Sequence, residues 1–212
     1  NNSWNHGTEG PTTNLLINDL RKRQQKNLIL SLLISKGVPM ILMGDEIGRS
    51  QGGNNNSWCQ NNLLGWMNWE HGQQDLELLE YFKYVIKIRK KLINIFNPSS
   101  FLNNQANENI PTYHWHGTKL DSPDWSSWSH TVAFSINKGN TNPLVWIGFN
   151  AYSKSIDFHL PKCKYNWLKV IDTNMLGIFE PLTINEKTVS IKSRSSLSVS
   201  YTHLTLPTIA KV

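Results

Sequence analysis

The sequence predicts two kinds of fold in one chain, an α/β segment followed by an all-β antiparallel sandwich. A helical pattern over residues 13–36 leads into an unbroken apolar run at 38–43, and a second helical pattern follows at 75–96. Beyond residue 99 the chain changes to short β-prone runs. With 212 residues, of which 39% are hydrophobic, the chain is able to bury a core and is not of the disordered class.

The α/β segment rests on one helix and one strand. Thr13 begins a helical pattern that Gly37 ends, with leucines recurring along it. The run Val38–Met43 has strand length, and its continuous apolarity predicts a strand buried on both faces, as in a parallel sheet. One strand cannot form a sheet, so we expect its neighbours to lie upstream or on a partner.

The segment 44–74 between the two helices shows little periodicity, yet it carries Trp58, Trp66 and Trp69. A loop of this length in a compact domain is usually functional or disordered, and three tryptophans argue against disorder. The helix expected at 75–96 has one broad apolar face. We therefore expect the loop to carry a function and the helix to pack on a core.

The second half of the chain predicts the sandwich. Its β-prone runs are separated by Asn, Gly, Pro, Asp and Ser, and they cover residues 110–116, 131–136, 144–150, 155–160, 167–172 and 188–192. Phe158 and Leu160 alternate with Asp157 and His159, as in a half-buried strand.

Charge and cysteine content narrow the function classes. The net charge is +6, and its densest clusters, Arg21–Arg23 and Arg89–Lys91, lie on predicted helices, which favours solvated helix faces. No nucleic-acid motif accompanies these clusters, so we expect no nucleic acid partner. The sequence contains no run of about 18 apolar residues, so we expect no membrane-spanning segment. Cys59 and Cys163 have no metal-ligand spacing and favour two free thiols, although one disulfide stays open. We expect no metal and no cofactor.

Asp45 and Glu46 follow the predicted strand directly, where active sites of barrels and open sheets lie. A retaining glycosidase needs two carboxylates about 5–5.5 Å apart across one bond. Neighbours on an extended strand point to opposite faces, so this pair does not suit that role. Two roles stay open for each carboxylate: accepting hydrogen bonds from sugar hydroxyls, or holding the loop through backbone N–H groups or Arg49.

The stretch Gly52–Gln60 carries the consecutive amides Asn54, Asn55 and Asn56. Uncharged amides both donate and accept hydrogen bonds, which suits ligands rich in hydroxyl groups, and Trp58 offers a ring for stacking on a sugar. An ordinary Gly/Asn turn beside core tryptophans explains the same composition. Both interpretations stay open from the residues alone.

Several motifs resemble isoamylase-type debranching enzymes of the α-amylase superfamily (glycoside hydrolase family 13). The most specific is the string Gly-Asn-Asn-Asn-x-x-Cys-Gln at residues 53–60, whereas Gly44-Asp45-Glu46 occurs widely in the superfamily. The other matching stretches are 2–12, 21–28, 37–40, 66–69, 114–116, 124–125 and 149–151. The resemblance covers residues 1–199, and Asn61 stands where the family usually has Asp.

The resemblance implies that residues 1–98 are the C-terminal slice of a (β/α)8 TIM barrel and that residues 99–199 are the antiparallel β-sandwich domain after it. It implies retaining hydrolysis of α-1,6 branch linkages in glycogen, amylopectin or limit dextrin. The family's catalytic carboxylates lie upstream of the matched stretch, so we expect no catalytic residue in this chain and no activity of the chain alone. Residues 200–212 look like translated adapter sequence, and we interpret them as a non-native tail.

What the chain would contribute is the wall of the substrate groove, with an α-glucan as partner. The substrate-binding candidates are Asp45, Glu46, Arg49, Asn54, Asn55, Asn56 and Trp58. The family further implies a cytoplasmic location, or a plastid one in a photosynthetic eukaryote. The competing hypothesis is a non-catalytic carbohydrate-binding or scaffold polypeptide related to debranching enzymes.

Overall fold

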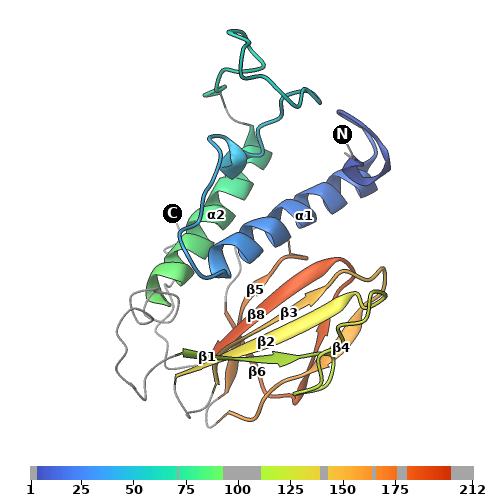
Figure 1. Ribbon diagram of the computed structural model, residues 1–212, viewed down its shortest axis with the longest axis vertical. Helices are drawn as coiled ribbons and strands as arrows, with labels where there is room; N and C mark the ends of the chain where they lie inside the picture. Colours follow the sequence, from blue (N-terminus) through green and yellow to red (C-terminus); the bar gives the residue numbers. More distant parts are fainter. Residues whose placement is uncertain are drawn as a thin grey trace.

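The computed structural model describes residues 4–70, 72–92, 111–138, 143–163, 166–175 and 181–201 (Figure 1). The helices are α1 (Leu15–Ile34) and α2 (Gln73–Lys91), with the short 3-10 turns η1 (Asn5–Gly7) and η2 (Asp45–Ile47). The strands are β1 (Pro111–His116), β2 (Thr131–Lys138), β3 (Pro143–Asn150), β4 (Ile156–His159), β5 (Trp167–Asp172), β6 (Leu182–Ile184), β7 (Thr188–Ile191) and β8 (Ser195–Tyr201).

The described strands form a sandwich of two sheets. Six of them make one antiparallel sheet in the order β1-β2-β3-β8-β5-β6, and β4 pairs with β7 in a second, two-stranded sheet. Both helices lie along one face of the large sheet, with α1 crossing above its strands (Figure 1). The β4-β7 pair packs on the opposite face. The predicted antiparallel β half is confirmed.

Strand β3 shows how one sequence serves both faces of the large sheet. Successive side chains of a strand point to opposite sides. Val145 and Ile147 accordingly join the core beneath the helices, while Trp146 is fully buried among residues of β4 and β7. Unbroken apolarity in β3 therefore reflects burial on both faces of its sheet.

A side chain caps the start of helix α1, and an arginine of helix α2 caps its end. The Asn14 carboxamide oxygen accepts hydrogen bonds from the backbone N–H groups of Leu16 (3.0 Å) and Ile17 (3.3 Å), as N-cap residues do. At the other end, the Arg89 guanidinium from α2 donates to the carbonyls of Leu33, Ser35 and Gly37. Because the last carbonyls of a helix lack internal partners, α2 stabilises the end of α1.

A polar seam fixes α1 on the sandwich. The Asn27 side-chain oxygen accepts from the hydroxyls of Thr173 (2.6 Å) and Ser196 (3.0 Å), and its amide nitrogen donates to the carbonyl of Arg194 (2.9 Å). Gln24, one turn earlier, donates to the same carbonyl at 3.1 Å. Satisfied polar contacts of this kind are directional, so they fix the rotation of the helix on the sheet as apolar packing alone does not.

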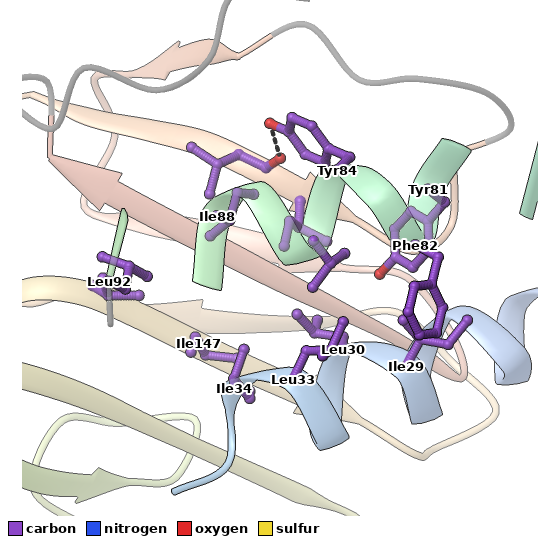
Figure 2. Packing of buried hydrophobic residues seen from close by; sticks show 14 of the residues in the cluster. Ile29, Leu30, Leu33, Ile34, Tyr81, Phe82, Tyr84, Ile88, Leu92 and Ile147 are labelled. Atoms are coloured by element: carbon purple, nitrogen blue, oxygen red, sulfur yellow. Dashed lines mark hydrogen bonds between the residues drawn. The ribbon is translucent and has the colours of Figure 1, made fainter. Parts of the chain in front are cut away.

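Helix α2 packs beside α1 and over the same face. Figure 2 shows Phe82 of α2 beside Ile29 of α1, and Ile88 joins the same buried cluster as Leu30 and Leu33. The Tyr84 hydroxyl donates to the carbonyl of Val170 in β5 at 2.9 Å, a bond drawn in Figure 2. Burial raises the pKa of Tyr84 to about 12, so the hydroxyl stays a donor at neutral pH.

The buried strand predicted at 38–43 is absent from the structure. Val38 is 92% exposed and Met40 89% exposed, and the segment runs as irregular chain into η2. A strand forms only where neighbouring strands satisfy its backbone groups, and none of the described strands pairs with this segment. The slice of a parallel barrel is therefore not seen as a sheet in the described residues.

Other sequence expectations have mixed outcomes. Both helices are confirmed, although residues 93–96 of the second lie outside the described residues. Strand β6 was not predicted, because its three residues are too short for a pattern. Strand β8 includes residues 200 and 201, the first two of the tail that we interpret as non-native, while 202–212 lie outside the described residues. Both cysteines are free. Neither described helix is long and apolar enough to cross a membrane.

We predict that Gly148→Ala destabilises the sandwich. A Cβ atom on Gly148 would lie 2.5 Å from a ring carbon of Trp146 and 2.6 Å from Cδ1 of Ile191, so the packed layer must shift. Overpacking of this kind costs about 1–3 kcal/mol. Urea unfolding measures the loss, with Ser190→Ala at an exposed strand position as control; equal midpoints for both variants would contradict the packing described.

We predict that His116 contributes to acid sensitivity. Its Nδ1 accepts the Asp121 backbone N–H (2.9 Å) and Nε2 contacts the Ser135 hydroxyl (3.0 Å), an arrangement that needs neutral imidazole. Burial lowers the pKa of His116 below 6.5. The unfolded chain therefore binds the proton first, and stability falls as the pH drops from about 7 toward 5. Urea midpoints across that range should fall less steeply for His116→Gln, and an unchanged slope would contradict this.

Candidate functional site

A polar groove lies beside the N-terminal half of α1. Its volume is about 550 Å³, and three segments form it: the N-terminal stretch, α1, and the chain after η2. The lining residues are Asn5, Glu9, Gly10, Pro11, Arg21, Gln25, Gly48, Arg49, Ser50, Gln51, Gly53, Asn54 and Asn55.

The turn η2 supports one wall of the groove. The Asp45 carboxylate accepts the backbone N–H of Leu42 (3.2 Å), and the Glu46 carboxylate accepts that of Gly44 (2.9 Å). Gly44 has a φ of 100°, and a Cβ there would lie 2.6 Å from the Arg49 side chain, so the turn needs glycine. Both carboxylates thus hold the loop, and neither lines the groove.

Arg49 lies at the junction between this turn and the long loop. Its Nη2 donates to the carbonyls of Leu64 (2.8 Å) and Gly65 (2.9 Å), which fastens the far end of the loop to its beginning. The side chain also lines the groove. Arg49 therefore combines a loop-holding contact with a position from which it can face a ligand.

The structure divides the asparagine triplet. Asn54 and Asn55 line the groove, while Asn56 lies outside it. The Asn54 side-chain oxygen accepts the backbone N–H of Asn56 at 2.9 Å, which closes a local turn. Trp58 is 93% exposed and does not line the groove. Of the residues predicted to bind substrate, Arg49, Asn54 and Asn55 are brought together.

Asn61 retains a hydrogen bond at the position where it departs from the family. Its side-chain oxygen accepts the indole N–H of Trp66 at 2.8 Å. A carboxylate would accept the same bond, so the change from Asp removes a charge and keeps the acceptor. The hydrogen bond to Trp66 therefore does not require that charge.

The groove presents five amide side chains, the Glu9 carboxylate and the guanidinium groups of Arg21 and Arg49, all of which are able to hydrogen-bond with hydroxyl groups. No group of three or more metal-ligating side chains occurs among the described residues. The substrate-binding candidates predicted from the sequence did not include five other lining residues, which are Asn5, Glu9, Arg21, Gln25 and Gln51. Arg21 and Gln25 are spaced one helical turn apart, which was the available signal, since such residues share a helix face.

Comparisons with known proteins agree with the motifs. Residues 114–207 match the family model described as "Isoamylase 1-3, C-terminal". "Isoamylase 1, chloroplastic" of Oryza sativa subsp. japonica is 35% identical over 187 residues, which are 86% of this chain and 22% of that protein. The "Glycogen operon protein GlgX homolog" of Mycobacterium bovis is 32% identical over 218 residues, 93% of this chain and 30% of that protein.

Among solved structures, the pullulanase type I from Bacillus subtilis str. 168 complexed with maltose has a TM-score of 0.62 at 18% identity. The match covers 86% of this chain and 24% of that one, and it shows a shared fold. The chain spans less than a third of the length of each of these proteins. Residues 114–207 therefore belong to the isoamylase C-terminal domain family, and the chain as a whole is similar to isoamylase-type debranching enzymes.

Proposed function

We propose that this chain is part of a retaining glycosidase that cleaves α-1,6 branch linkages in α-glucans, and that it supplies a wall of the substrate groove. The observation that carries the proposal is the amide-rich groove, built by the loop whose Gly-Asn-Asn-Asn-x-x-Cys-Gln string resembles isoamylases. A glucan presents hydroxyl groups that both donate and accept hydrogen bonds, and Asn54 and Asn55 offer the complementary pattern.

Residues 1–98 fit the last part of a barrel in this proposal, with 99–199 as the sandwich domain. Apolar side chains are exposed on α1 and on the segment after it, and these are Leu15, Leu16, Leu28, Leu32, Val38, Met40, Leu42 and Met43. Exposed apolar surface of this extent marks a contact with further protein. Neighbouring barrel strands would cover the 38–43 segment and satisfy its backbone.

We infer the cellular location of this protein from its relatives. The name of the rice relative places that protein in the chloroplast. A cytoplasmic location, or a plastid one in a photosynthetic eukaryote, remains our prediction for this chain. Free Cys59 and Cys163 are compatible with a cytoplasmic location, because the cytosol keeps thiols reduced.

We predict that Asn55→Ala weakens binding of maltotetraose, a soluble linear α-glucan, while Asn56→Ala leaves it unchanged. Asn55 lines the groove and Asn56, its neighbour of the same type, does not. Loss of one hydrogen bond is worth about 1 kcal/mol, or about fivefold in affinity. Isothermal titration of the full chain measures both variants, and equal affinities would contradict the assignment of the groove.

We predict that the chain alone releases no reducing ends from amylopectin, because Asp45 and Glu46 are adjacent and both hold backbone N–H groups. A reducing-sugar assay over long incubation measures this, with a complete isoamylase as positive control. Release that disappears in Asp45→Asn or Glu46→Gln would place the chemistry in this chain and overturn this part of the proposal.

A further inference from the structure

The Arg21 side chain ties the N-terminal wall of the groove to α1. Its Nε and Nη2 donate to the carbonyl of Asn5 at 3.2 and 3.0 Å, and its Nη1 donates to the carbonyl of Gly10 at 2.9 Å. Nη2 also donates to the carbonyl of Thr8. All three nitrogens of one guanidinium are thus bonded to backbone oxygens of a six-residue stretch, 5–10, whose ends both line the groove.

The backbone held in this way is strained. Asn5 and His6 are consecutive non-glycine residues with φ of 43° and 61°. Left-handed backbone is uncommon in residues other than glycine, although Asn and His adopt it more readily than most, and two such residues in succession persist where surrounding contacts enforce them. The double bond from Arg21 to the Asn5 carbonyl lies at the first of these residues. Strain next to a ligand-sized groove marks a wall whose shape has to be kept.

We infer that Arg21 is the positioning residue of the glucan groove: it holds residues 5–10 in the shape that binds substrate and leaves contact with sugar to Arg49, Asn54 and Asn55. This inference rests on the proposed function of the same groove. Arg49 differs from Arg21 because only its Nη2 donates to the backbone of described residues. Arg21 therefore holds the 5–10 stretch, whereas Arg49 holds residues 64 and 65, which do not line the groove, and keeps Nε and Nη1 as donors for a ligand.

Arg23 supplies a matched control two residues along the same helix. It is half-buried like Arg21 and also donates to a loop carbonyl, that of Ser193, at 3.0 Å. Ser193 belongs to the sandwich side of α1, and Arg23 does not line the groove. The two residues match in chemistry, helix and kind of contact, and they differ in the wall that they hold.

The test measures maltotetraose affinity and amide hydrogen exchange in the full chain for the wild type, Arg21→Ala and Arg23→Ala. We expect Arg21→Ala to lose about tenfold or more in affinity and to speed exchange at residues 5–10, since an unheld wall has to be ordered on binding. Millimolar methylguanidinium should restore part of that affinity by refilling the vacated site. Arg23→Ala should lower the urea midpoint and leave affinity and the exchange of residues 5–10 unchanged.

Each outcome decides a separate statement. Wild-type affinity and exchange in Arg21→Ala, or equal loss of affinity in both variants, overturns the inference. A wild-type chain that does not bind maltotetraose overturns the proposed function, and exchange at residues 5–10 then still decides whether Arg21 holds the wall. Should Arg21→Ala fail to fold, Arg21→Lys serves instead. Its compact ammonium does not reproduce the planar fork of three nitrogens that holds residues 5–10, and unchanged exchange in that variant counts against the inference.

Discussion

The packing of α1 and α2 against one face of the six-stranded sheet is the contact on which the rest of the described structure depends. Its apolar part places Leu30 and Leu33 over Ile147. Apolar contacts are non-directional, so they permit the helix to slide or rotate. The hydrogen bonds of Asn27 to Thr173, Ser196 and Arg194 remove that freedom.

The groove inherits its shape from this packing. Because the contacts of Asn27 fix the middle of α1 on the sandwich, the turns before Asn27 hold Arg21 and Gln25 at a defined place in the groove. The irregular stretch 5–10 is attached to α1 by Arg21, and the long loop after η2 is closed on itself by Arg49. Guanidinium groups suit this task, since their fixed fork of donors reaches several acceptors at once. These segments lack the regular backbone hydrogen bonds of helices and strands, and the arginine contacts hold them in one conformation instead.

Residues that were expected to contact substrate divide into two groups in the structure. Asp45 and Glu46 hold the η2 turn through backbone N–H groups, which is one of the two roles that their sequence position left open. Asn54 and Asn55 face the groove, and Asn56 does not, although the three are alike in type and adjacent in sequence. Sequence identifies the segment and its chemistry, while the loop's turns decide which amides face inward.

The features that could be predicted without the structure are local and periodic ones. Alternating and helical patterns located both helices and most strands, because the spacing of apolar residues along the chain follows the period of a helix or a strand. Short motifs identified the family. The tertiary structure decided what depends on distant partners: that 38–43 stays exposed where no strand pairs with it, and that Arg21 reaches the carbonyls of residues 5–10. Hydrogen bonds between segments far apart in sequence produce no periodic pattern of residue types, so only the folded chain reveals them.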